Sequence, residues 1–130
     1  MVVDTSALVA ILLNEPERAA YNASIAASAI RLISAASLLE AALVIESRKG
    51  ASGQAELDRF VLRARLDVVA FDALQAEAAR FGWRRFGKGR HPAALNFGDC
   101  FSYALAKCTG EPLLFKGTDF SMTDIVCVPS

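Results

Sequence analysis

Short apolar segments alternate with longer, helix-like segments along this chain, and no two-residue hairpin turn joins any two of the short ones. The short segments are candidate strands: Val2–Val3, Ile30–Ile33, Val68–Phe71, Leu113–Phe115 and Ile125–Val128. The longer segments are candidate helices: Ala7–Leu13, Glu15–Ala27, Ser37–Arg48, Gln54–Arg65, Ala73–Phe86 and Phe97–Thr109. This alternation is typical of βαβ units. The sequence therefore predicts an α/β fold with a parallel sheet of about five strands.

The chain has the size and composition of one folded domain. Its 130 residues are 54% apolar and 22% charged, which excludes a disordered chain, and we expect residues 1–130 to form a single domain. The longest uninterrupted apolar run, Ala7–Leu13, is too short to span a bilayer. Met1–Asp4 carries no basic residue ahead of its apolar ones, unlike a secretory signal. We expect a cytoplasmic protein without membrane association, whose three cysteines are buried free thiols.

Four carboxylates lie at or just past the ends of apolar segments: Asp4, Glu40, Asp99 and Asp119. In an open parallel sheet, residues that follow different strands converge at the carboxyl edge, where ligands bind. Two carboxylates about 4 Å apart repel each other by roughly 4 kcal/mol at an effective dielectric constant near 20, so a group of four needs a cation. Oxygen ligands suit a hard ion, and the pattern predicts a Mg²⁺ or Mn²⁺ site.

Each acid taken alone also suits a structural role. Asp4 and Asp99 stand where helix caps are expected, and Ser37–Glu40 reads as a capping box. Asp119 suits a turn, and Asp124 lies close enough in sequence to replace it in the site. The apolar residues after Glu40 predict a buried helix, on which a carboxylate needs a partner. This context favours the metal site for the four together.

A basic segment interrupts an otherwise balanced charge pattern. The chain has 14 cationic and 14 anionic residues, yet no carboxylate lies between residues 78 and 98. Five cations fall within that stretch: Arg80, Arg84, Arg85, Lys88 and Arg90. Trp83 and Phe86 are interleaved with them, and this pattern is typical of a nucleic-acid backbone contact with an aromatic ring available to stack on a base. A solvated helix end with core or interface aromatics explains the segment equally well.

Four motifs together resemble a known family. They are Val3–Leu8 (VDTSAL), Ser37–Glu40 (SLLE), Leu95–Ala106 (LNFGDCFSYALA) and Leu113–Phe120 (LLFKGTDF). In this order and spacing they are similar to the PIN-domain toxins of VapBC toxin–antitoxin modules. The resemblance covers essentially the whole chain, and it implies a three-layer, Rossmann-like PIN domain.

The resemblance also implies a chemistry and partners. It implies an endoribonuclease that hydrolyses RNA phosphodiester bonds, often in transfer RNA or other structured RNA, by means of a water activated by one or two Mg²⁺ or Mn²⁺ ions. It further implies inhibition by a cognate VapB-type antitoxin, and a toxin homodimer. The family's catalytic and metal-binding acids fall on Asp4, Glu40, Asp99 and Asp119, and the hydroxyl that supports the first acid falls on Thr5 or Ser6. Asn96 adds a short polar side chain beside Asp99, which makes it a further supporting candidate. The five cations of the basic segment become candidate RNA contacts.

Two other functions stay open at the level of sequence. One is an α/β domain that has kept the metal site but only holds RNA or a protein partner. The other is a nuclease of related fold that acts on DNA. Intact acids favour catalysis, and Asp4-Thr5-Ser6 lacks the second acid of an Asp-x-Asp phosphatase nucleophile pair.

Overall fold

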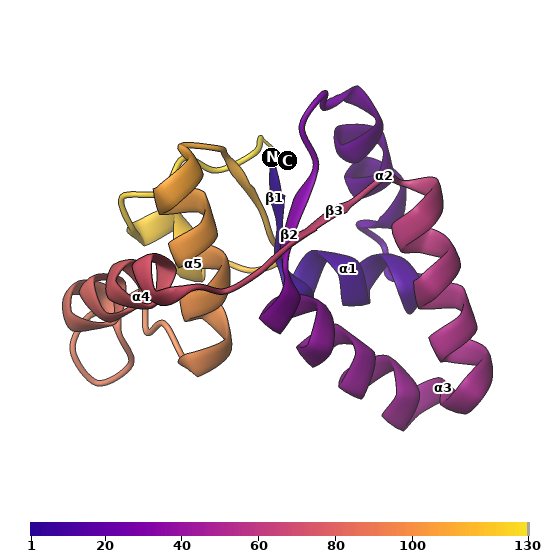
Figure 1. Ribbon diagram of the computed structural model, residues 1–130, viewed down its shortest axis with the longest axis horizontal. Helices are drawn as coiled ribbons and strands as arrows, with labels where there is room; N and C mark the ends of the chain where they lie inside the picture. Colours follow the sequence, from indigo (N-terminus) through magenta and orange to yellow (C-terminus); the bar gives the residue numbers. More distant parts are fainter. Residues whose placement is uncertain (130) are drawn as a thin grey trace.

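The computed structural model describes residues 1–129, in which a parallel sheet separates two groups of helices (Figure 1). The strands are β1 (Val2–Val3), β2 (Leu32–Ser34), β3 (Asp67–Val69) and β4 (Leu113–Leu114). The helices are α1 (Thr5–Leu12), α2 (Arg18–Ala27), α3 (Ala35–Arg63), α4 (Ala73–Phe86), α5 (Phe97–Thr109) and the short 3₁₀ helix η1 (Asp119–Met122). The predicted α/β class with a parallel sheet is confirmed. No helix within residues 1–129 is long and apolar enough to cross a membrane.

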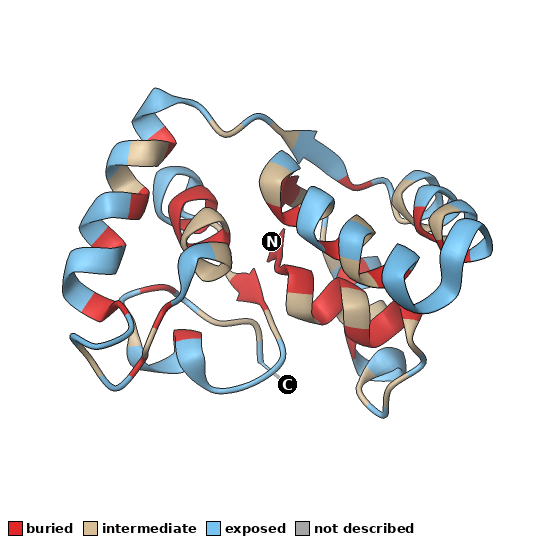
Figure 2. Ribbon diagram, turned by 90° about the horizontal axis from the view of Figure 1, so that it is seen from below, coloured by how far each residue is buried: buried red, intermediate tan, exposed pale blue. Residues whose placement is uncertain are grey.

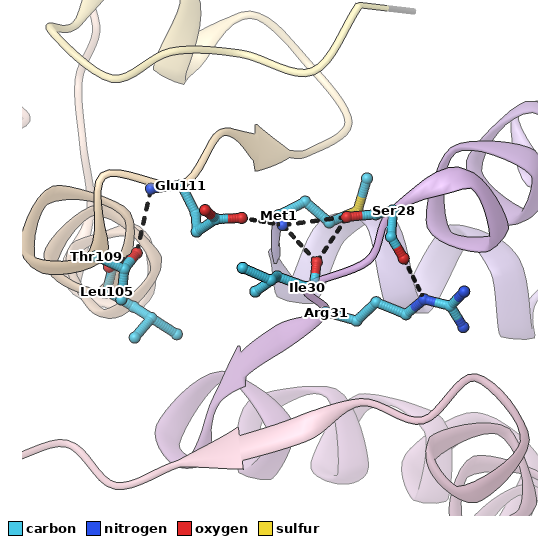
Figure 3. Close-up of polar contacts among 7 residues, drawn as sticks. All are labelled: Met1, Ser28, Ile30, Arg31, Leu105, Thr109 and Glu111. Carbon is cyan, nitrogen blue, oxygen red and sulfur yellow. Dashed lines mark hydrogen bonds and ion pairs between the residues drawn. The ribbon is translucent and has the colours of Figure 1, made fainter.

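The sheet has the order β3-β2-β1-β4, and every neighbouring pair is parallel. β1 is central and fully buried, with Val2 in register with Leu32 on one side and Leu113 on the other. The amino terminus of Met1 donates to the carbonyl of Ile30 at 2.6 Å and pairs with the Glu111 carboxylate at 2.7 Å (Figure 3). These contacts fix the start of β1, so that its carboxyl end lies at a defined point on the sheet edge.

Helices cover both faces of the sheet, which gives the three layers. In Figure 1, α1, α2 and α3 lie to one side of the strands, and α4 and α5 lie to the other. One apolar core joins α1 and α3 to the sheet through residues such as Leu8, Ile11 and Ile45. A second core joins α5 to β1 and β4 through Tyr103 and Leu105. Buried residues accordingly gather along the inward faces of the helices (Figure 2).

One predicted break is confirmed and one predicted strand is shortened. The helices predicted at Ser37–Arg48 and Gln54–Arg65 are the two halves of α3, which is interrupted at Gly50, whose non-helical φ of 64° only glycine adopts readily. The predicted fifth strand at Ile125–Val128 is reduced to one parallel bridge between Leu113 and Cys127. Pro129 follows it and cannot donate a ladder hydrogen bond, which limits its extension.

Two burial predictions are wrong. Glu40 lies on the exposed side of α3, because only the face with Ser37, Ala41 and Ile45 is buried. The cysteines are free, as predicted, but Cys108 is exposed and the other two are half-buried. Cys108 lies at the end of α5, where the helix leaves the core.

Candidate active site

Asp4 lies directly after β1 and caps the start of α1. Only 4% of the residue is exposed. Its Oδ2 accepts the backbone N–H of Ser6 at 3.0 Å and the hydroxyl of Ser6 at 2.7 Å, and its Oδ1 accepts the hydroxyl of Ser102 at 2.5 Å. Both carboxylate oxygens are therefore held, so that the side chain has one orientation before any ligand arrives.

Buried hydroxyls tie Asp4 to the neighbouring elements. Ser6 Oγ accepts the backbone N–H of Lys116 at 2.9 Å, so the hydroxyl proton of Ser6 is free to point at Asp4. Ser102 Oγ lies 3.2 Å from Ser37 Oγ. Because Ser102 donates its proton to Asp4, Ser37 is the donor in that contact. Hydroxyl groups thus join Asp4 to the segment that follows β4, to α3 and to α5.

Ser37 and Ser102 are site residues that the sequence analysis missed. Ser102 follows Asp99 by three positions, which places both on one face of α5, and this spacing was the available signal. Of the two hydroxyls predicted as alternatives to support the first acid, Ser6 hydrogen-bonds to Asp4, whereas Thr5 donates to the carbonyl of Ser37 at 2.9 Å. The structural reading of Ser37–Glu40 as a capping box is wrong, since Ser34 caps α3.

Asp99 lies in the first turn of α5, facing the other acids. Asn96 caps the helix by accepting the N–H of Asp99 at 2.9 Å, and Asp99 accepts the N–H of Asn96 at 3.1 Å. The pKa of Asp99 is raised to about 6, mainly because the carboxyl group is buried; the hydrogen bond from Asn96 opposes this shift, and the charges of Asp4, Asp119 and Glu40 add to it. Asp99 therefore takes part in the cap of α5 and also faces the other three acids.

Glu40 reaches the same place from α3. A Cβ added at Gly98 would lie 2.5 Å from Glu40 Oε2 and 2.9 Å from Oε1, so the carboxylate rests against the backbone of Gly98. Any larger residue at position 98 would push it away. Glycine directly before Asp99 thus permits acids from α3 and α5 to approach each other.

Asp119 and Asp124 have different surroundings. Asp119 begins η1, is exposed, and is among the charges that raise the pKa of Asp99. Asp124 accepts the hydroxyl of Tyr103 at 2.8 Å and pairs with Lys107 at 2.6 Å. Burial acts to raise the pKa of Asp124, but the contacts with Lys107 and Tyr103 outweigh it, so that the pKa is lowered. Of the two candidates for the fourth acid, Asp119 is the one that the structure brings towards Asp99.

The four acids, here called the acidic edge, have no cationic partner. Within residues 1–129, no lysine or arginine forms an ion pair with Asp4, Glu40, Asp99 or Asp119. Among the same residues, no three acidic, histidine or cysteine side chains stand close enough to enclose a metal ion. All four side chains offer carboxylate oxygens, the ligand type that hard divalent ions take.

The basic segment divides between two faces of the protein. Arg80, Arg84 and Arg90 line a groove between α4 and α5, together with Trp83. Arg85 instead stacks on Phe81 and Phe86 and lies 3.9 Å from Asp124. Lys88 is exposed in the following loop. Phe86, one of two rings predicted to stack on a base, is buried in the core, so that only Trp83 remains available.

Known proteins resemble the chain over its whole length. The PIN domain family model matches residues 1–126. Ribonuclease VapC30 of Mycobacterium tuberculosis (strain ATCC 25618 / H37Rv) is 59% identical over 128 residues, which are 98% of each chain. Ribonuclease VapC of Mycolicibacterium smegmatis is 57% identical over 128 residues, covering 98% of this chain and 99% of the relative.

Solved structures share the fold at lower identity. Mycobacterium tuberculosis VapC20, described as a sarcin–ricin loop cleaving toxin, superposes with a TM-score of 0.78 at 21% identity, covering 99% of this chain and 98% of that one. VapBC2 from Rickettsia felis, bound to a DNA fragment from its promoter, gives a TM-score of 0.74 at 19% identity, covering 98% of this chain and 96% of that one.

Proposed function

Since the chain belongs to the PIN-domain family, as a VapC-type ribonuclease toxin, we propose that it is an endoribonuclease that depends on Mg²⁺ or Mn²⁺. The observation that carries this proposal is the acidic edge: four carboxylates from four elements, without a cationic partner among residues 1–129. A divalent ion relieves their repulsion and is what such a group selects.

Asp4 and Asp99 are the residues we propose to hold the ion, because they are the most buried of the four acids. Glu40 and Asp119 complete the site directly or through water. When bound, one or two ions supply positive charge to the phosphate oxygens and lower the pKa of a water molecule. The hydroxyls of Ser6 and Ser102 keep Asp4 oriented throughout, which is the usual role of groups that hydrogen-bond to a metal ligand.

The reaction we propose is hydrolysis at phosphorus. A water oxygen bonds to the scissile phosphorus, the bond from phosphorus to O3′ breaks, and O3′ leaves with a proton. Glu40 stands at the edge of the site, where it can orient the water. The products carry a 5′-phosphate and a 3′-hydroxyl. No histidine is needed, and His91, the only one, accepts the N–H of Ala93 and packs against Phe86.

RNA with exposed backbone is the substrate class that the basic groove supports. Arg84 and Arg90 lie on the α4–α5 side of the acidic edge, where they can hold phosphates on either side of the cut bond. We propose a transfer RNA or another structured RNA as substrate. We also propose that residues 1–130 form a single PIN domain and that the protein acts in the cytoplasm.

A protein partner is the further part of the proposal. Leu39 and Leu43 are 59% and 58% exposed on α3 and flank Glu40, so that a segment docked on them covers the acidic edge. Exposed apolar patches of this kind mark interaction sites. We propose that a VapB-type antitoxin docks there and blocks the site, and that the free toxin forms a homodimer. Sedimentation of the free toxin measures the dimer, and co-purification of a Leu43→Glu variant with the antitoxin measures the docking.

The test uses the purified protein freed from antitoxin. It is incubated with total RNA, with DNA of matched length and with a small phosphate ester, each with Mg²⁺, with Mn²⁺ and with EDTA. We expect cleavage of RNA only, loss of cleavage in EDTA, and 5′-phosphate ends on the products.

Two results contradict the proposal. Cutting of DNA at the rate of RNA makes the protein a DNA-directed nuclease. Binding of RNA without turnover under any metal condition makes it a non-cleaving binding domain.

A further inference from the structure

The groove between α4 and α5 is a built cavity beside the acidic edge. Its volume is about 650 Å³, within the range of about 300–1,000 Å³ that ligand pockets occupy. Its lining is mainly apolar and aromatic, and it is contributed by Phe71 after β3, by Ala76, Ala79 and Trp83 of α4, and by Phe97 and Phe101 of α5. A cavity of this size and lining admits a flat group and excludes a duplex.

The aromatic rings form an ordered wall. Phe101 packs edge-on against Phe71, with centroids 4.8 Å apart, and against Phe97, with centroids 4.9 Å apart. Phe97 stands at the open end of this row and is 81% exposed. A large apolar ring left so open, yet held by its neighbour, is a platform on which a planar ligand can stack.

Three arginines give the groove its charge. Arg90 lies over the Trp83 ring at 4.3 Å from its centroid, and Arg80 pairs with Glu77 at 3.1 Å. Arg84 has no ion-pair partner within residues 1–129. Among residues 1–129, no carboxylate lines the cavity. A ligand that complements the groove therefore carries flat aromatic groups and negative charges together, as a nucleotide does.

The groove and the acids both include residues of the first turn of α5. Phe97 is followed directly by Gly98, which touches the Glu40 carboxylate, and then by Asp99. An RNA strand that places one phosphate at Asp99 therefore has its neighbouring nucleotide within reach of Phe97.

We propose that this groove is a nucleobase pocket, which takes one unpaired base of the RNA next to the cut bond. Phe97 and Trp83 stack on the base, and Arg84 and Arg90 hold the flanking phosphates. The inference rests on the proposed function and deepens it. It makes the substrate an RNA in which at least one nucleotide beside the scissile phosphate is unpaired, because a paired base cannot leave the stack without cost.

The test follows the fluorescence of Trp83, which is the only tryptophan and lies in the groove. The wild-type protein in EDTA is titrated with a single-stranded oligoribonucleotide and with an abasic chain of equal length and charge. The same titrations are made with Phe97→Ala and with Leu62→Ala, a control residue that is 78% exposed on α3. Because both side chains are largely exposed, we expect both variants to fold, and thermal unfolding checks this.

We expect the base-bearing RNA to change Trp83 fluorescence and to bind the wild type and Leu62→Ala about 5- to 100-fold more tightly than the abasic chain. In Phe97→Ala we expect this preference to shrink towards one. Equal binding of both chains by the wild type overturns the pocket and leaves only a phosphate contact. Unchanged RNA binding by Phe97→Ala, with loss of co-purification with the antitoxin, overturns it in favour of a protein occupant.

Cleavage separates this inference from the proposed function. A synthetic RNA stem-loop that the wild type cuts is compared with versions abasic at the nucleotides next to the cut. If the protein cuts RNA with divalent ions but without regard to these bases, the pocket is wrong and the ribonuclease stands. If it binds base-bearing RNA selectively and cuts none, the ribonuclease is wrong and the pocket stands.

Discussion

The acidic edge and the α4–α5 groove both include residues of α5, but the first contains a buried, hydrogen-bonded carboxylate, whereas the second is open and exposed. On one face of α5, Asp99 and Ser102 meet a buried carboxylate whose oxygens are already held by hydroxyls. On the other face, Phe97 and Phe101 border an open cavity with exposed rings and arginines. We infer that the carboxylate proposed for catalysis is held in place before substrate binds. The rings and arginines proposed for recognition are exposed and gain their contacts only when substrate binds.

Replacing the buried acid should give the largest effect. Asp4→Ala removes a proposed metal ligand, and loss of groups that merely orient ligands already costs about 10- to 100-fold. We expect RNA cleavage to fall at least about 100-fold, with RNA binding retained through the groove. Gel-based cleavage rates and fluorescence titrations measure the two separately. If binding falls as far as cleavage, the division of labour between the two regions is wrong.

Removing a hydroxyl from the fixed region should cost less. Ser102→Ala deletes the donor to Asp4 Oδ1, and we expect cleavage to fall about 10- to 100-fold and the Mn²⁺ concentration for half-maximal rate to rise. Ser52→Ala, an exposed hydroxyl on α3 that donates to Lys49, is the control. If Ser102→Ala has the metal dependence of the wild type, the hydrogen bond from Ser102 is not needed to orient Asp4.

A substitution at Gly98 should change the rate of cleavage without lowering the stability of the protein. In Gly98→Ala the new methyl group meets Glu40 Oε2, and the flexible Glu40 side chain can move aside at little cost to folding. Alanine also stabilises a helix by up to about 1 kcal/mol over glycine. We expect an equal or higher Tm with a rate about tenfold lower, on the scale of lost orienting groups. A wild-type rate removes Glu40 from the site.

The charge of the groove is tested by two adjacent arginines. Arg84→Glu reverses a charge that lines the groove, whereas Arg85→Glu changes one that lies on the other face near Asp124. We expect Arg84→Glu to weaken RNA binding and to flatten its salt dependence by about one unit of slope, with kcat little changed. Arg85→Glu should alter the slope less. Equal slopes for the two variants mean that the RNA does not follow the groove.

The smallest effect concerns stability and pH. The pKa of Asp99 is about 6 in the folded protein against an ordinary 3.8, so the folded state keeps a proton that the unfolded chain releases. This carboxyl therefore lowers stability progressively as pH rises between those two values, and by a constant amount above about pH 6. In EDTA, Asp99→Asn should be more stable at pH 7.5, on the order of 1 kcal/mol since water screens a partly buried group. At pH 3.5 the gain should vanish.

Thermal unfolding at both pH values measures this change. Mg²⁺ should stabilise the wild type and not the variant. A variant less stable than the wild type at pH 7.5 in EDTA contradicts the account of Asp99.

Much of the fold was predictable because local signals agree with it. Helix α4 has its predicted bounds, Ala73–Phe86, and α5 runs from Phe97 to Thr109 as predicted, between an Asn96 cap and Gly110. Strand bounds were less accurate, since strands of two or three residues carry little pattern. The break within α3 was predictable too, because Gly50 adopts readily the non-helical φ of 64° that separates the two halves of α3.

The four acids of the candidate site could be named from the sequence, whereas the serines that hydrogen-bond near Asp4 could not. Acids at the ends of apolar segments are recognisable in a sequence because they interrupt the apolar pattern. Ser102 and Ser37 carry no such signal, since a serine in a helix is usually neutral and its partner is 65 positions away in sequence. The exposure of Glu40 was missed because an apolar run was read as a buried helix, whereas Leu39 and Leu43 face outwards.

The central claim is that Asp4 and Asp99 form one divalent-metal site that cuts RNA. The most direct measurement is the rate of cleavage of one defined RNA as a function of Mn²⁺ concentration, for the wild type and for Asp99→Asn. The account predicts no cleavage in EDTA, a saturable rise with Mn²⁺ for the wild type, and a rate at least about 100-fold lower for the variant at every concentration. Equal rates for the two proteins, or cleavage that persists in EDTA, would contradict it.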